Sequence, residues 1–199
     1  MTAVGLYLYH DVEVLDFAGP FEVFSTAARM QARLGAAGHF EVFTISNDIQ
    51  SVRARGGLRV STQYSLHDHP ALDVLIIPGG DVSAELQQSD VIRWIATTAR
   101  STRVTASVCT GALLLAAASL LDGKRATTHW EDADALQRDF PTVRVQVGPR
   151  WIDEGEVVTS AGISAGIDMS LHLVRRLAGA ELARTTARQM DFDWTDRGA

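Results

Sequence analysis

One stretch decides the fold: Val104-Thr105-Ala106-Ser107-Val108-Cys109-Thr110-Gly111-Ala112, which continues into Leu113-Leu114-Leu115-Ala116-Ala117-Ala118. Its first part predicts a short buried strand. Its last part predicts a helix, because Ala and Leu are strong helix formers. Since almost no residues remain for a loop, Cys109 falls on a sharp turn between strand and helix, where Gly111 permits a tight backbone. The sequence therefore predicts a nucleophile elbow that carries a thiol.

The position of Cys109 suggests a reactive thiol. Unpaired N–H groups and the positive end of the helix dipole favour a thiolate and can hold an anion that forms beside the sulfur. The alternative is that Cys109 is a small buried hydrophobic residue, which is common for a free cysteine.

Composition sets the broad class. The chain has 199 residues, of which 46% are hydrophobic, with a formal net charge of -6. These values predict a single domain over residues 1–199, and the acidic charge disfavours nucleic-acid binding and a polybasic membrane patch. With one cysteine the chain forms no internal disulfide. We find no signal peptide and no apolar run long enough to span a bilayer, so we expect a cytoplasmic protein.

Strands alternate with helices along the chain, which predicts an α/β fold with a mainly parallel sheet. Ligands of such sheets bind at the carboxyl ends of the strands, where Asp16, Gly80, Cys109 and Ile163 all fall. The expected strands are 3–9, 40–46, 73–78, 104–108, 143–147 and 151–159, the last with a turn at Glu154-Gly155, and a hairpin is expected over 52–63. The expected helices begin near Pro20 and run over 90–99, 112–121, 132–140, 167–177 and 181–190.

Asp16 lies in the first crossing from strand to helix, between apolar Leu15 and Phe17. A carboxyl group that is partly removed from water has a raised pKa and can hold a proton near neutral pH. The alternative is that Asp16 caps the helix that follows.

Two other motifs end predicted strands or occupy turns. Gly79-Gly80 follows an apolar strand, and glycines there let backbone approach a ligand and aim an N–H group at it. His67 and His69 form an H-x-H pair in a polar turn. Because no third ligand is in view, we expect no metal site.

Several motifs together resemble the DJ-1/PfpI superfamily. They are Pro78-Gly79-Gly80, the elbow 107–111 (SVCTG), the run 120–130 (LLDGKRATTHW), and the segments 15–20 (LDFAGP) and 161–168 (AGISAGID). The resemblance covers nearly the whole chain. It implies a flavodoxin-like α/β sandwich and a homodimer whose sites lie near the interface. It implies no metal and no organic cofactor.

Within this superfamily, Cys109-Thr110 together with Asp16 is similar to the isocyanide hydratases. That similarity implies that Cys109 attacks a small-molecule isocyanide, which is then hydrolysed to an N-substituted formamide. Asp16 would relay protons, Thr110 would orient the site, and the N–H groups of Gly80 and Thr110 would face developing charge. Gly79, Gly80, Gly111, Ile163 and His129 are the expected substrate-binding residues.

Three alternatives stay open. The runs 127–130 (TTHW) and 160–176 also resemble the sensor domain of AraC-type regulators, which would bind a small molecule without turnover. The chain ends at Ala199, without the two helix-turn-helix motifs of those regulators. His129-Trp130-Glu131 has the H-x-E spacing of the glutamine amidotransferase triad, although we expect His129 to be structural or a pocket wall. A DJ-1-like role in oxidative stress or carbonyl detoxification is the third alternative.

Overall fold

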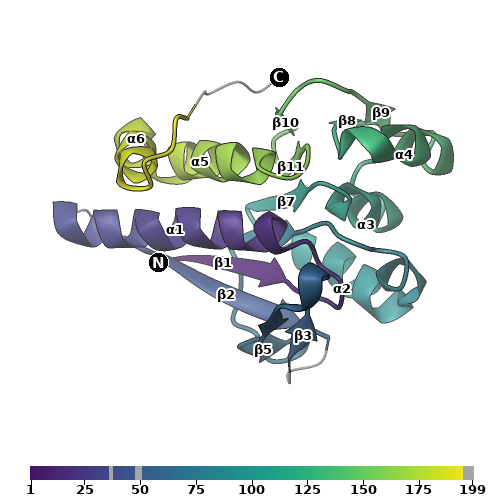
Figure 1. The fold of residues 1–199 in the computed structure, drawn as a ribbon, viewed down its shortest axis with the longest axis horizontal. Helices are drawn as coiled ribbons and strands as arrows, with labels where there is room; N and C mark the ends of the chain where they lie inside the picture. The colour runs from purple at the N-terminus through teal and green to yellow at the C-terminus, as the bar shows by residue number, and fades with distance from the viewer. Residues whose placement is uncertain (36–37, 48–50, 195–199) are drawn as a thin grey trace.

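The computed structural model describes residues 1–35, 38–47 and 51–194, and it is built around a seven-stranded sheet (Figure 1). The strand order is β10-β11-β7-β6-β1-β2-β5, and all neighbours are parallel except the β10–β11 pair. The strands are β1 (Thr2–Tyr7), β2 (Phe40–Ser46), β5 (Tyr64–Ser65), β6 (Val74–Ile77), β7 (Val104–Val108), β10 (Trp151–Asp153) and β11 (Val157–Ser160). The expected α/β class with a mainly parallel sheet is confirmed.

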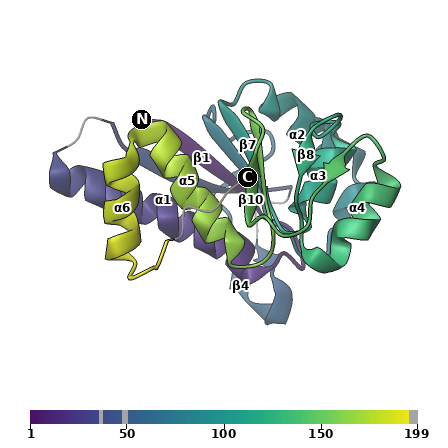
Figure 2. The same ribbon diagram turned by 90° about the horizontal axis from the view of Figure 1, so that it is seen from above.

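Helices cover both faces of this sheet, as Figure 2 shows. One layer holds α1 (Val14–Leu34), α5 (Ala165–Ala178) and α6 (Ala180–Gln189), which pack on one another. The other layer holds α2 (Ser89–Ala99), α3 (Gly111–Ala117) and α4 (Ala133–Asp139).

Short strands and 3-10 turns lie outside the main sheet and its helices. The expected hairpin is formed by β3 (Val52–Arg53) and β4 (Arg59–Val60), with the 3-10 turn η1 (Arg55–Gly57) at its tip. A separate parallel pair joins β8 (Arg125–Ala126) to β9 (Arg144–Val145). Two further 3-10 turns are η2 (Glu85–Gln87) and η3 (Trp130–Asp132).

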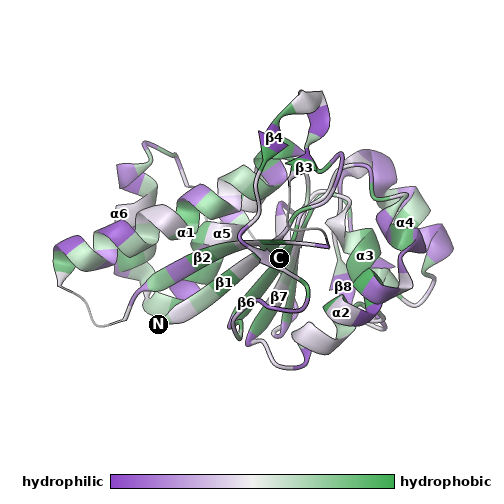
Figure 3. Cartoon of the chain, turned by 90° about the horizontal axis from the view of Figure 1, so that it is seen from below, coloured by the Kyte–Doolittle hydropathy of each residue, from purple (hydrophilic) through white to green (hydrophobic). Residues whose placement is uncertain are grey.

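The central strands are buried on both faces. Every residue of β6 and β7 is buried, and Figure 3 shows these strands largely in the hydrophobic colour between the two helical layers. This burial explains the unbroken apolar run of β6 (VLII), whereas β7 alternates apolar residues with the buried polar residues Thr105 and Ser107. In the described part of the chain no helix is long and apolar enough to cross a membrane.

Some expected boundaries were wrong. Helix α1 begins at Val14, so Pro20 lies inside the helix and not in its first turn. Helix α3 ends at Ala117, short of the expected 121. In place of the strand expected over 143–147, the structure has only the short strand β9, which is not part of the main sheet. Packing against neighbouring elements decided these three cases, and local propensity does not report it.

The tight turn after β7 depends on Gly111. A Cβ atom there would lie 2.1 Å from the carbonyl oxygen of Ile77, which belongs to the backbone of β6. We therefore expect Gly111→Ala to lower the free energy of unfolding by about 1–3 kcal/mol, as overpacking does. Without that contact, Ala would be the better helix former and would stabilise the protein by about 1 kcal/mol. Urea unfolding measures the sign, and a stabilised variant would contradict the close approach.

Candidate active site

Cys109 sits on the turn between β7 and α3 with a φ of 56°, in the left-handed region that few residues other than glycine adopt. Two hydrogen bonds hold this conformation. The Cys109 N–H donates to the Ser160 carbonyl at 3.1 Å, and the Thr128 hydroxyl donates to the Cys109 carbonyl at 2.8 Å. The side chain is 7% exposed. The turn thus presents the thiol at the end of β7, as the sequence predicted.

Asp16 lies beside this thiol, in the first turn of α1, and is fully buried. Its Oδ2 atom accepts the Gly79 N–H at 3.1 Å, whereas its Oδ1 atom has no hydrogen-bond partner among the residues that the structure describes. Burial raises the pKa of Asp16 to about 7, against the opposing effects of the Gly79 hydrogen bond and of an interaction with the Cys109 thiol. The alternative of a helix cap was wrong, because the cap residue is Glu13 and no side chain caps the helix.

The surroundings of the Cys109 thiol oppose its ionisation. Burial raises the pKa of Cys109 to about 12, and the nearby Asp16 charge adds to the effect. A hydrogen bond from the Thr110 backbone N–H lowers the pKa, but less than burial raises it. Burial and the Asp16 charge thus oppose the thiolate that the turn is expected to favour, and a reactive Cys109 stays a prediction. At neutral pH the pair holds a neutral thiol beside a carboxyl group that populates both of its protonation states.

Gly79, Gly80 and Thr110 hold the two reactive groups in place. The Gly80 N–H donates to Thr110 Oγ1 at 2.8 Å, and the Thr110 hydroxyl donates to the Gly80 carbonyl at 2.9 Å. The Gly80 N–H is therefore occupied, which corrects the expectation that it faces developing charge. A Cβ on Gly79 would lie 2.6 Å from the Thr110 nitrogen and 2.8 Å from Asp16 Oδ2. Only glycine lets the strand end lie this close to both residues.

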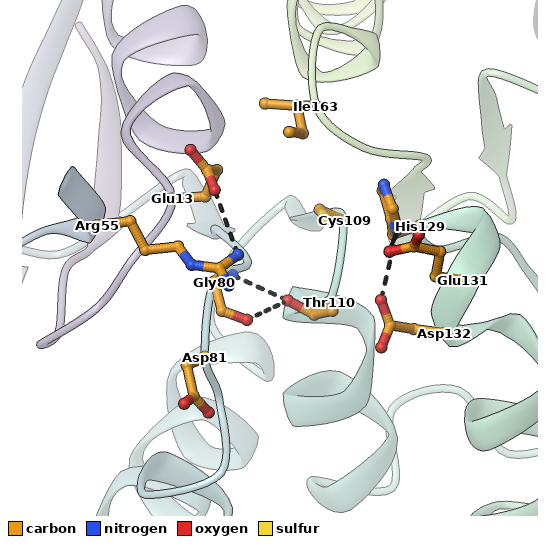
Figure 4. Close-up of a pocket in the computed structure, with 10 residues that line it drawn as sticks. All are labelled: Glu13, Arg55, Gly80, Asp81, Cys109, Thr110, His129, Glu131, Asp132 and Ile163. Carbon is orange, nitrogen blue, oxygen red and sulfur yellow. Dashed lines mark hydrogen bonds and ion pairs between the residues drawn. The ribbon is translucent and has the colours of Figure 1, made fainter.

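A cavity of about 290 Å³ opens above Cys109 (Figure 4). The expected residues Gly80, Thr110, His129 and Ile163 line it together with Cys109, and so do Glu13, Arg55, Asp81, Glu131 and Asp132. Two expected substrate-binding residues, Gly79 and Gly111, are not among the lining residues and instead pack against backbone beneath them.

No sequence pattern indicated that Arg55 or Glu13 lies at this cavity. Arg55 comes from the tip of the β3–β4 hairpin, and its Nη1 atom lies 3.4 Å from Glu13 Oε2. The backbone N–H of Arg55 also donates to the Val12 carbonyl at 3.0 Å, which ties the hairpin to the start of α1. Only this tertiary contact brings the two side chains to the site.

His129 forms one wall of the cavity and does not bond to Cys109 in the described structure. Its Nδ1 atom faces two carboxylates, Asp132 at 3.5 Å and Glu131 at 3.8 Å. Gly162 lies between the imidazole and the thiol, since a Cβ there would be 2.6 Å from Cys109 Sγ and 2.8 Å from His129 Cδ2. This geometry does not form a Cys-His-Glu triad, and it agrees with the expected pocket wall.

The described residues contain no cluster of three or more His, Cys, Asp or Glu side chains that could hold a metal ion. In the H-x-H pair, both ring nitrogens of His69 have neighbours: Nε2 accepts the Trp94 indole N–H at 2.9 Å, and Nδ1 lies 2.8 Å from the Pro70 carbonyl oxygen.

The sequence was compared with known proteins. A family model described as "DJ-1/PfpI family" matches residues 2–176. The chain is 34% identical over 191 residues to isonitrile hydratase from Pseudomonas putida, covering 95% of this chain and 78% of that protein. It is 30% identical over 191 residues to the HTH-type transcriptional regulator GbdR from Pseudomonas aeruginosa. That match covers 96% of this chain and 51% of the regulator, so the chain spans about half of the regulator's length.

Among solved structures, the fold is similar to a THiJ/PfpI family protein from Pseudomonas syringae. The TM-score is 0.85 at 26% identity, and the match covers 96% of this chain and 75% of that one.

The buried carboxyl group of Asp16 makes stability depend on pH. Its pKa rises from 3.8 to about 7 on folding, so between these values the unfolded chain has lost a proton that the folded protein keeps, and stability falls as the pH rises. The neutral Asp16→Asn variant lacks this loss. We expect the variant's free energy of unfolding, relative to wild type, to grow by about 2–3 kcal/mol from pH 5 to pH 8. Urea titrations measure this difference in the free energy of unfolding. A difference that does not change with pH would contradict a buried Asp16 of raised pKa.

Proposed function

Because the chain belongs to the DJ-1/PfpI family, we propose that it is a cysteine-dependent hydratase that converts an isocyanide into an N-substituted formamide. The observation that supports this most is the pairing of a buried thiol, which lines a cavity, with a buried carboxyl group of raised pKa beside it. The similarity to an isonitrile hydratase, which is a hydratase of isocyanides by another name, supports the same reaction.

In the first step, the ionised Asp16 carboxylate takes the thiol proton as the Cys109 sulfur attacks the terminal carbon of R–N≡C. A carbon–sulfur bond forms, and Asp16 returns the proton to that carbon. The product is the thioimidate R–N=CH–S–Cys109, so the thiol has added across one carbon atom without oxidation or reduction. The pKa of Asp16, near 7, suits this role, because a proton carrier works best when its pKa lies near the working pH.

In the second step, water adds to the thioimidate carbon. Asp16 takes a proton from the water, and a proton moves to the nitrogen, which gives R–NH–CH(OH)–S–Cys109. This adduct loses the sulfur as the carbonyl forms, and the thiol regains its proton. The sum is one isocyanide and one water converted to R–NH–CHO. The Thr110 N–H, which hydrogen-bonds the Cys109 sulfur, would stabilise the charge that develops as the sulfur leaves.

Turnover of cyclohexyl isocyanide tests the proposal directly. Wild type should form the formamide, Cys109→Ala should form none, and Asp16→Asn should be slower by roughly a hundredfold or more, as loss of a general acid–base group is. In wild type, kcat/KM should rise with pH around an apparent pKa near 7, because protonated Asp16 cannot accept the thiol proton.

The matched control is Glu22→Gln, which removes an exposed carboxylate from the same helix and should keep wild-type turnover. Failure of folded wild type to hydrate any simple isocyanide would overturn the hydratase proposal. The chain would then be a small-molecule-binding protein related to regulator sensor domains, which its similarity to GbdR supports. Thermal-shift screening with small molecules would follow.

We further propose that the protein forms a homodimer. Leu15 of α1 and Leu58 of the β3–β4 hairpin are large apolar residues with 40% and 49% of their surface exposed. Each lies within three positions of a residue that lines the cavity, Glu13 or Arg55. A second copy would cover such side chains. Light scattering should give roughly twice the chain mass of 21.6 kDa, and Leu58→Glu should lower the mass towards that of one chain. A monomeric wild type would overturn this proposal.

A further inference from the structure

The cavity above Cys109 has an unusual charge. Four carboxylates (Glu13, Asp81, Glu131 and Asp132) line it against one guanidinium, that of Arg55. Ile163 is the only aliphatic side chain among the lining residues of the described structure. The hydratase mechanism accounts for Cys109, Asp16 and Thr110, but it gives no role to these carboxylates.

One carboxylate is neutralised and the others are not. Glu13 pairs with Arg55 at 3.4 Å. Asp81 accepts the Ser83 N–H at 3.1 Å, and hydrogen bonds from Ser83 lower the pKa of Asp81, so it is ionised at neutral pH. In the described part of the chain, the His129 imidazole is the only ion-pair partner of the Glu131 and Asp132 side chains. Figure 4 shows Asp81 on one side of Cys109 and the other two on the opposite side.

These charged side chains surround the candidate active site. The cavity has the Cys109 thiol at its floor, and beside the thiol lies Asp16, fully buried, with its Oδ1 atom unpartnered. Trp130, 69% exposed, lies next to His129 with ring centroids 5.7 Å apart. An exposed indole offers its face to organic cations. The nucleophile locates the site, and the carboxylates around it indicate which ligands enter.

We propose that the site selects positively charged substrates: small isocyanides that carry an ammonium or quaternary ammonium group a few atoms from the reacting carbon. The inference rests on the proposed hydratase function. A cleft lined by one sign of charge concentrates ligands of the opposite sign and repels those of the same sign. The ammonium group of such a substrate would bind near Asp81, Glu131 and Asp132, while its isocyanide carbon contacts Cys109.

Isosteric substrates separate charge from shape. The probes are (CH₃)₃N⁺–CH₂–CH₂–NC, its neutral isostere (CH₃)₃C–CH₂–CH₂–NC, and the anion ⁻OOC–CH₂–CH₂–NC. We expect kcat/KM for the cation to exceed that for the neutral isostere by about tenfold or more at low salt, with the anion slowest. The ratio should shrink at high salt, because ions screen exposed carboxylates.

Charge variants tie the preference to these side chains. The double variant Asp81→Asn with Glu131→Gln should bring the cation-to-neutral ratio close to one. The control is Glu41→Gln, which removes an exposed carboxylate from the start of β2, at the opposite edge of the sheet, and should keep the wild-type ratio.

A binding measurement keeps this inference separate from the hydratase proposal. Calorimetric titration of Cys109→Ala with the formamides of the cationic and neutral probes needs no turnover. Binding of the cationic formamide about tenfold or more tightly than its isostere supports the charge selection even where no isocyanide is hydrated. Equal affinity, tighter binding of the neutral compound, or no detectable binding of the cation overturns it.

Discussion

The site depends on a carboxyl group that folding removes from water. Asp16 accepts the backbone N–H of Gly79 and interacts with the Cys109 thiol, and its Oδ1 atom has no hydrogen-bond partner among the described residues. These interactions do not offset the desolvation of a charge, so the pKa of Asp16 rises to about 7. The same burial, with the neighbouring Asp16 charge, raises the pKa of Cys109. In the proposed mechanism the two groups act as a pair, in which the Asp16 carboxyl group takes and returns the proton of the Cys109 thiol.

The parallel sheet makes this pair possible. Strands β1, β6, β7 and β11 end at the same edge, and the segments that follow them carry the groups of the site. Glycines let these segments approach one another more closely than any side chain would allow, as at Gly79 against Thr110 and at Gly162 against Cys109. The cost of the left-handed backbone at Cys109 is met by hydrogen bonds to its amide and carbonyl groups.

The floor and the walls of the cavity differ in chemistry. At the floor lies the buried thiol of Cys109, with the buried carboxyl group of Asp16 beside it, and the proposed hydratase reaction uses this pair. The walls carry carboxylates that are exposed or half-buried, and these would act on a ligand at longer range, without forming bonds to the reacting atoms. One fold can thus keep its nucleophile and change its ligand, because the walls come from the β3–β4 hairpin and the loops around η3, which can vary without disturbing the sheet.

The sequence by itself determined the α/β class, the central strands, the elbow at Cys109 and the gathering of Asp16, Gly80 and Ile163 at one edge, because these depend on local periodicity and on the order of strands and helices. It misplaced the start of α1 and the end of α3, where packing overrides propensity. Only the tertiary structure decided the protonation of the pair and the charge of the cavity. Burial is set by neighbours distant along the chain, and Arg55 reaches Glu13 only once the hairpin folds back on α1.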